Sequence, residues 1–246
     1  MTQDLVTNLI ELRKRLIYII LGIIVVFLCL FHFANDLYII LAKPLLAVTP
    51  LASKLIATDV TSPFIIPIKL TLICAFVASL PNTLYQIWQF LAPAMFKPEK
   101  RMLLITIICV IVLFSLGIIF CYFLIFPTFF KFIGSFKSSS IAIMTDITKY
   151  FDFVLNLFFI FGLAFETPIL VFLLIYFNLV SYNKFKKARP YIFVASFMIA
   201  AILTPPDVLS QIMLAIPLYL LYELGMIFSI FIKHKPQLKE NNINDI

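Results

Sequence analysis

Long apolar stretches fill most of this 246-residue chain, and they constrain its fold more than any other feature. Hydrophobic residues make up 63% of the chain and charged residues 13%. A soluble domain is roughly 45–50% apolar and about 25% charged, and no polar segment here is long enough to form one. The sequence therefore predicts an all-α integral membrane protein, a single polytopic domain surrounded by the lipid bilayer.

Six membrane spans are predicted from the apolar stretches, because about 20 apolar residues are needed to cross the hydrocarbon core. The spans cover residues 16–33, 65–92, 102–126, 151–177, 191–204 and 212–232, and residues 233–246 form a short tail. The fifth span is short, since a helix of its length reaches only roughly 21 Å at about 1.5 Å per residue. Its length alone would also fit a re-entrant segment, so the distribution of charge has to decide.

Positive charge is distributed unevenly along the chain and predicts its orientation. Of the 19 Lys and Arg residues, 13 lie in four clusters, at 13–15, 97–101, 184–189 and 233–239. Cytoplasmic loops are enriched in Lys and Arg, and the last two clusters share one side only if the fifth stretch crosses the membrane. Both termini are therefore expected in the cytoplasm, with "TPPDVLSQ" as an external turn. The net charge of +7 then reflects topology and attraction to anionic lipids, with no nucleic-acid partner.

A carboxylate interrupts the apolar run "FGLAFETPIL" within the fourth predicted span. A charged side chain at the centre of a bilayer costs at least about 2.5–3.5 kcal/mol, so Glu166 has a functional interpretation by default. No Lys or Arg lies near mid-depth in any predicted span. We therefore expect Glu166 either to be protonated or to face a water-filled concavity, and we expect Pro168 to bend the span.

Three polar residues share one helix face near the cytoplasmic end of the second span: Asn82, Gln86 and Gln89. They are expected either to form hydrogen bonds between helices or to line a polar groove within the membrane. Two carboxylates, Glu11 and Glu99, lie among basic residues on the cytoplasmic side. Each could form a weak surface ion pair. If the two converge in space, they could instead bind a cationic peptide, because arginine binds carboxylates through a bidentate fork.

Several classes of activity lack their sequence signature. The chain has no phosphate-binding loop and no histidine pair with metal-ligand spacing, so neither a cofactor nor a metal is expected. An intramembrane protease is disfavoured because no convincing catalytic pair is present, and the chain is not expected to be an enzyme. A proton-coupled small-molecule permease that uses Glu166 is the alternative to a protein-transport function. Such permeases often contain an internal repeat, and we find none.

Six motifs resemble those of one family, and they follow the family's order over nearly the whole chain: "NLIELRKRL", "IATDVTSPFIIPIKL", "YQIWQFLAPAMFKPEKR", "FGLAFETPIL", "KKARPY" and "LTPPDVLSQIMLAIPLYLLYE". Together they resemble TatC, the multispanning core subunit of the twin-arginine (Sec-independent) protein translocase, in its proteobacterial form. The chain departs from the family pattern at Asn8, where His is common, and at Pro98, and its C-terminal tail is short.

The resemblance implies a glove-shaped fold of six transmembrane helices with a concave face, in the bacterial cytoplasmic (inner) membrane. It also implies a function: binding the twin-arginine signal peptides of folded precursor proteins, and transporting those proteins with the proton motive force. The implied partners are the single-span subunits TatA and TatB, other TatC copies and the precursor proteins.

The resemblance further assigns roles to individual residues. Signal-peptide binding is implied for Glu11, Arg13, Phe90 and Glu99. Glu166 corresponds to an intramembrane carboxylate on the concave face, where Gln86 is also expected to line the groove. The remaining assignments are partner docking for Tyr122 and Gln211, and external functional positions for Pro44 and Asp207.

Overall fold

A computed structural model describes residues 2–46, 56–57, 59–135, 146–177, 179–203 and 208–230. Over these residues the chain forms ten α-helices, one 3-10 turn and one π-helical segment, and an isolated bridge pairs Ile56 with Asp146. The predicted all-α fold is therefore confirmed. The chain divides into two compact units, Met1–Phe165 and Glu166–Ile246. The second unit therefore begins at Glu166.

Within the described ranges, four helical stretches are long and apolar enough to span a membrane: Val6–Phe31, Lys100–Phe130, Ile147–Tyr176 and Gln211–Ile230. A fifth arises if α3 (Ser62–Ala78) and α4 (Leu80–Leu91), which are bent by 45° relative to each other, form one span. Helix α9 (Tyr182–Leu203) does not qualify, because every 18-residue stretch within it contains at least three basic residues. The chain is thus a multi-pass membrane protein. The six-span count and the cytoplasmic termini are compatible with these helices and remain predictions.

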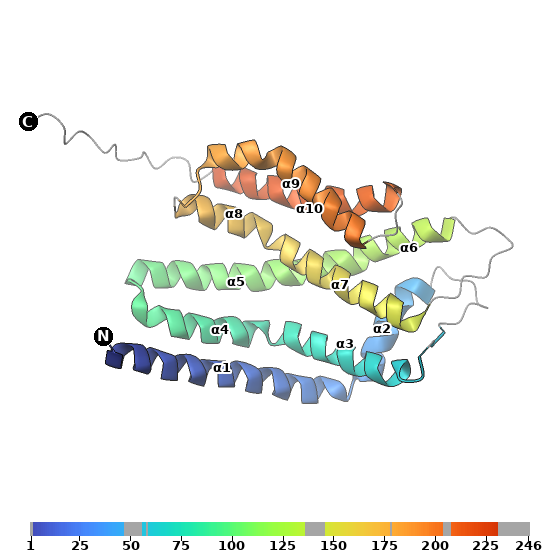
Figure 1. Cartoon of the computed structure of the whole chain (residues 1–246), viewed down its shortest axis with the longest axis horizontal. Coiled ribbons are helices and arrows are strands. Elements are labelled where there is room, and N and C mark those ends of the chain that lie inside the picture. The colour runs from blue at the N-terminus through green and yellow to red at the C-terminus, as the bar shows by residue number, and fades with distance from the viewer. Residues whose placement is uncertain are drawn as a thin grey trace, which may run out of the picture. The chain divides into compact units, whose positions relative to one another are not determined.

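The first unit is built around two helix contacts. Helix α1 (Thr2–Phe31) lies along α3 and α4, and α5 (Lys97–Phe120) packs against α7 (Ile147–Phe165) (Figure 1). The α5–α7 contact is close because both helices carry glycine there. A Cβ atom at Gly117 would lie 2.6 Å from the carbonyl oxygen of Phe161, and one at Gly162 would lie 2.7 Å from the Phe114 ring. Small residues let membrane helices approach in this way.

Prolines interrupt the helices of the first unit at two positions. The bend between α3 and α4 falls at Ser79, and Pro81 occupies the first turn of α4. Ahead of Pro127, the segment Cys121–Ile125 is π-helical, and the N–H of Phe126 bonds the carbonyl of Cys121, five residues back. Helix α6 (Phe126–Ser135) follows. A proline cannot donate to the carbonyl one turn before it, which accounts for both breaks in the regular pattern.

Helix α2 (Ala34–Leu46), in the predicted external segment, is held by tyrosines from other helices. The Tyr122 hydroxyl donates to the carbonyl oxygen of Ile40 at 3.0 Å, and the Tyr150 hydroxyl donates to that of Leu41 at 2.6 Å. Within a helix, the carbonyl of Ile40 would accept from residue 44, but Pro44 has no N–H. Tyr122 therefore supplies the hydrogen bond that Pro44 cannot make.

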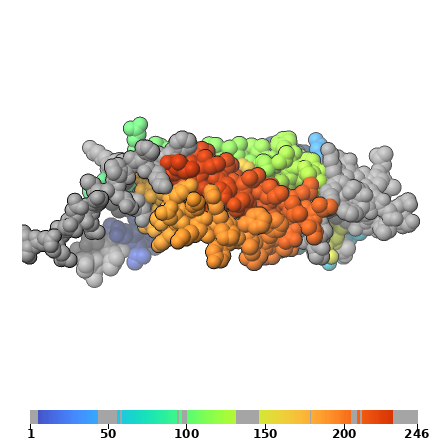
Figure 2. Space-filling view, turned by 90° about the horizontal axis from the view of Figure 1, so that it is seen from above, coloured from blue at the N-terminus to red at the C-terminus, as the bar shows by residue number. Residues whose placement is uncertain are grey.

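The second unit contains α8 (Thr167–Tyr176), α9 and α10 (Val208–Ile230). Helix α10 packs against both others, and Figure 2 shows α9, in orange, beside α10, in red. The core of the second unit is formed by Val171, Tyr222 and Met226. An ion pair joins α9 to α10, with Arg189 Nη2 lying 2.7 Å from Glu223 Oε2, and the Tyr219 hydroxyl donates to Glu223 Oε1 at 2.7 Å.

The ion pair between α9 and α10 can be tested with paired substitutions. Glu223→Gln or Arg189→Met alone leaves one partly buried group without its partner, and we expect a loss of about 1 kcal/mol, or about 2–4 °C in melting temperature. The double substitution Arg189→Met/Glu223→Gln should lose less than the sum of the two single changes. Tyr219→Phe, which keeps both charges, is the matched control for the lost hydrogen bond. Thermal unfolding in detergent measures all four, and strictly additive losses would refute the coupling.

The role of Tyr122 at α2 predicts a rescue. Tyr122→Phe leaves the carbonyl of Ile40 without this donor, and because the hydrogen bond is exposed we expect a loss of stability of about 0.5–1.5 kcal/mol. Adding Pro44→Ala restores a backbone N–H at the right position and should recover much of this loss. The control is Tyr150→Phe, which deprives Leu41 of its donor and should not be rescued by Pro44→Ala. Equal recovery in both backgrounds, by thermal unfolding, would show that the rescue is unspecific.

Candidate functional site

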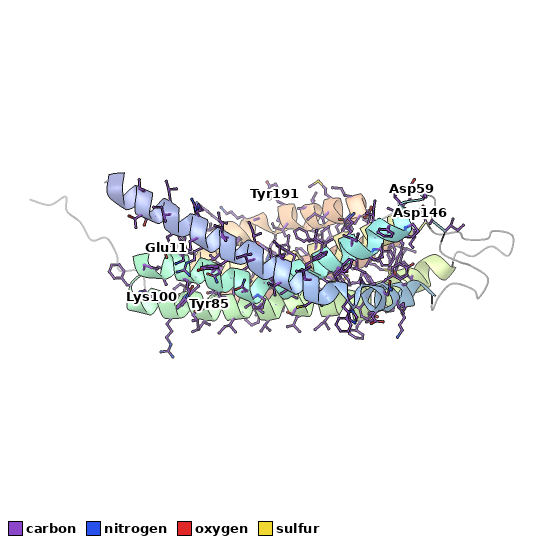
Figure 3. All side chains as sticks on the ribbon, turned by 90° about the horizontal axis from the view of Figure 1, so that it is seen from below. Glu11, Asp59, Tyr85, Lys100, Asp146 and Tyr191 are labelled. Atoms are coloured by element: carbon purple, nitrogen blue, oxygen red, sulfur yellow. The ribbon has the colours of Figure 1, made fainter. Side chains whose placement is uncertain are left out.

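One end of the first unit combines acidic, basic and apolar groups from three helices. Figure 3 shows Glu11, Tyr85 and Lys100 toward this end, and Asp59 and Asp146 toward the opposite end. Glu11, Tyr85 and Lys100 belong to α1, the middle of α4 and the start of α5 respectively. Two of the predicted cytoplasmic clusters, 13–15 and 97–101, lie in the same segments. The fold therefore brings the two cytoplasmic motifs of the sequence analysis to one end of the unit.

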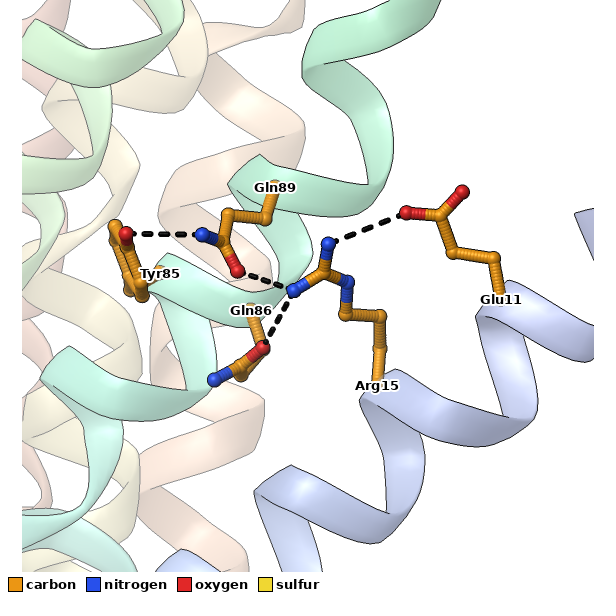
Figure 4. A network of polar contacts seen from close by, with 5 residues as sticks. All are labelled: Glu11, Arg15, Tyr85, Gln86 and Gln89. Atoms are coloured by element: carbon orange, nitrogen blue, oxygen red, sulfur yellow. Dashed lines mark hydrogen bonds and ion pairs between the residues drawn. The ribbon is translucent and has the colours of Figure 1, made fainter.

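Arg15 is at the centre of the polar contacts in this region (Figure 4). Its Nη2 lies 3.2 Å from Glu11 Oε1, one turn earlier on α1. Its Nη1 donates to Gln86 Oε1 at 3.2 Å and also to Gln89 Oε1. Gln89 in turn donates from Nε2 to the Tyr85 hydroxyl at 2.9 Å. A single guanidinium thus connects the carboxylate of α1 to two amides of α4.

The polar face of α4 is turned toward α1. A Cβ atom at Gly22 of α1 would collide with the side-chain amide of Asn82, while Gln86 and Gln89 accept hydrogen bonds from Arg15. These contacts agree with the expectation that this face forms hydrogen bonds between helices. The expectation that Gln86 lines a groove within the membrane remains a prediction. Sequence reasoning missed Arg15 as the partner. Its spacing of four residues from Glu11 was the available signal, because such pairs share one helix face.

Apolar side chains adjoin these charges where α4 ends. Phe90 is half-buried in the last turn of α4, and the chain then passes through a 3-10 turn, Ala92–Ala94, into α5. Leu91 and Phe96 are 40% and 76% exposed. The Trp88 Nε1–H donates to the carbonyl oxygen of Lys100 at 3.5 Å, which connects α4 to the first turn of α5. The exposed apolar groups therefore lie on the connection between α4, which Arg15 joins to Glu11, and α5.

The other predicted site residues are placed as follows. Arg13 is exposed on α1, and Glu99 lies in the first turn of α5, although its side chain is outside the described part. Glu166 is half-buried between α7 and α8. In the second unit, Gln211 donates from Nε2 to the carbonyl of Phe197 at 3.0 Å. Asp207 lies outside the described residues.

A second polar pair, absent from the sequence analysis, borders a pocket in the first unit. Lys69 of α3 forms an ion pair with Asp152 of α7 beside a space of about 610 Å³. Its walls are mainly apolar, with Ile23, Leu72 and Phe159 among them. Among the described residues, no group of three or more His, Cys, Asp or Glu side chains could hold a metal ion.

Comparison with known proteins gives consistent results over nearly the whole chain. The family profile described as "Sec-independent protein translocase protein (TatC)" matches residues 7–217. The TatC protein of Escherichia coli K12 is 45% identical over 239 residues, which cover 97% of this chain and 93% of that protein. The TatC protein of Haemophilus influenzae is 43% identical, with 99% of this chain and 95% of that protein covered.

The fold matches a solved structure as well. A crystal structure described as that of the twin-arginine translocase receptor TatC superposes with a TM-score of 0.78 at 36% identity. The match covers 92% of this chain and 99% of the crystallised one. Sequence and fold agree over the same extent, and the chain belongs to the TatC family of Sec-independent protein translocase proteins.

Proposed function

We propose that this chain is the signal-peptide receptor and core subunit of a twin-arginine protein translocase. The observation that carries the proposal is that the partly exposed carboxylate of Glu11 is joined through Arg15 to Gln89 of α4, the helix that ends at the exposed apolar residue Leu91. A signal peptide has a basic segment followed by an apolar one, so a receptor for it needs both kinds of surface close together. Membership of the TatC family supports the same function.

Arginine recognition follows from the chemistry of Glu11. Its side chain is 37% exposed, so a ligand can reach the carboxylate from solvent. A guanidinium fork can bind both carboxylate oxygens at once, whereas a lysine ammonium cannot. Glu99 is proposed as the second carboxylate, because position 99 adjoins Lys100 at the same end of the unit. Two carboxylates would then match two consecutive arginines, with Arg13 and Phe90 as neighbouring contact residues.

Transport follows from the membrane part of the chain and from its partners. We place the protein in the bacterial inner membrane, with both termini in the cytoplasm and the proton motive force as the source of energy. TatA and TatB are proposed to dock at Tyr122 and Gln211, and further copies of the chain are proposed to complete the complex. Asp207 and Pro44 are proposed to act on the external side. Glu166 and Gln86 are proposed to line the groove that receives the signal peptide.

Carboxylate substitutions test the receptor function. Glu11→Gln and Glu99→Gln should each weaken the binding of a twin-arginine peptide by roughly 10- to 100-fold, because each removes a charge-assisted contact of about 1.5–3 kcal/mol. The loss should be larger at low salt, where charges are screened less. Asp59→Asn, a carboxylate at the opposite end of the unit, is the matched control. Unchanged peptide photocrosslinking in the double variant would rule out the proposed site.

Substitution of Glu166 tests the groove. Glu166→Leu should lower both water accessibility along residues 159–174 and export of a twin-arginine precursor, because the polar group that favours water is lost. Glu166→Gln keeps a polar side chain and should retain more of both. Cysteine labelling of this segment by a water-soluble reagent measures the first effect, and an export assay measures the second. A Glu166→Leu variant with normal labelling and normal export would exclude a groove role for this carboxylate.

A further inference from the structure

We infer that Arg15 occupies the Glu11 carboxylate in the resting receptor, and that an arginine of the signal peptide displaces it while Gln86 and Gln89 keep Arg15 on α4. The inference rests on the proposed signal-peptide function. It assigns Arg15 the role of a positioning residue that competes with the ligand. The geometry that points to it is the asymmetry of the Arg15 contacts on α1 and on α4 (Figure 4).

The contact of Arg15 with Glu11 is incomplete. A single bond joins Nη2 to Oε1 at 3.2 Å, longer than the approximately 2.7–2.9 Å of a strong charge-assisted bond. The Nε of Arg15 is buried and has no acceptor among the residues that the structure describes. A ligand guanidinium that donates to both oxygens of Glu11 has a better hydrogen-bond geometry than Arg15 has. An incoming arginine can therefore replace Arg15 at Oε1.

The contacts on α4 explain where Arg15 remains after this exchange. Its Nη1 donates to both Gln86 and Gln89, and the Gln89 side chain is itself oriented by the Tyr85 hydroxyl. Loss of the Nη2 contact leaves these bonds in place, so the packing of α1 against α4 does not have to break when a peptide binds. The two glutamines thus keep the Arg15 guanidinium on α4 and limit its competition with the peptide for Glu11.

The arrangement also explains why a resting receptor needs Arg15. The side chains of Glu11 and Arg15 are 37% and 22% exposed, and a partly buried carboxylate without a partner is unfavourable. Arg15 neutralises Glu11 between transport cycles, and its guanidinium is the same chemical group as the ligand's. Competition by Arg15 lowers the affinity of the receptor for the peptide, and a lower affinity favours release of the peptide once transport begins.

Two substitutions in this network are expected to change the affinity for the peptide in opposite directions. We expect Arg15→Gln to tighten the binding of a peptide with consecutive arginines by about twofold, the size of a helix i,i+4 ion pair. A matched peptide with consecutive lysines should change less, because an ammonium needs only one carboxylate oxygen. Gln89→Leu should weaken binding of the arginine peptide, because Arg15 then turns more fully to Glu11. In the Arg15→Gln background, Gln89→Leu should have no further effect.

The measurement uses the full chain in lipid nanodiscs, a fluorescent peptide of each kind, and a melting curve for every variant. A purely structural role for Arg15 predicts weaker binding and lower melting temperature in all variants together, which would overturn the inference. If Arg15→Gln does not fold, Arg15→Lys serves, because the single nitrogen of an ammonium cannot occupy the positions of both Nη1 and Nη2, and it should also tighten binding.

Glu11→Gln distinguishes a failure of the proposed receptor function from a failure of the proposed competition by Arg15. If Glu11→Gln leaves the affinity for the arginine peptide unchanged, the receptor function at this site is wrong and the role of Arg15 is wrong with it. If Glu11→Gln weakens binding but neither Arg15 variant tightens it, the receptor function stands and only the competition by Arg15 is refuted.

Discussion

A polar group in the hydrocarbon of a membrane has no water to bond, so it has to find its partner within the protein. The packing of this chain depends on that constraint. Thr71 and Ser115 each donate to a carbonyl one turn earlier in their own helix, and such contacts need no neighbouring helix. Arg15 and Arg189, which belong to the predicted cytoplasmic clusters, reach instead to another helix, α4 and α10 respectively. These longer side chains determine which helix faces adjoin, and the first of them also forms part of the proposed site.

The prolines extend the same argument to the backbone. Pro81 and Pro127 interrupt regular helix at the α3–α4 bend and after the π-helical segment. At Pro44 the unsatisfied carbonyl of Ile40 becomes the acceptor for Tyr122. A residue that removes one hydrogen bond from its own helix thus creates the attachment point for a side chain from another segment. Tyr122, proposed from the family resemblance as a docking residue, has a structural role at α2 whatever it contacts in a complex.

Sequence reasoning went furthest where a feature is local. It predicted the all-α membrane fold and the shared face of Asn82, Gln86 and Gln89. It also predicted a bend at Pro168, which lies in the first turn of α8, directly after the interruption between α7 and α8 at Glu166. It did not predict Arg15 as the partner of that face, nor the Lys69–Asp152 pair. Helical spacing shows which residues share a face, but it does not show which helix lies opposite. The basic start of α9 also continues the helix beyond its apolar part, so apolar length alone underestimates that helix.

The sequence by itself determined the environment of this protein and its breaks: apolar runs require a membrane, prolines remove N–H donors, and basic clusters favour one side. The tertiary structure decided the pairings. The bonds of Arg15 to Gln86 and of Tyr122 to Ile40 join residues 71 and 82 positions apart, and such pairs form only after the helices have packed. The pair of Glu11 and Arg15 is local to α1, and the tertiary structure joins this pair to α4 because α4 brings the amides of Gln86 and Gln89 to Arg15.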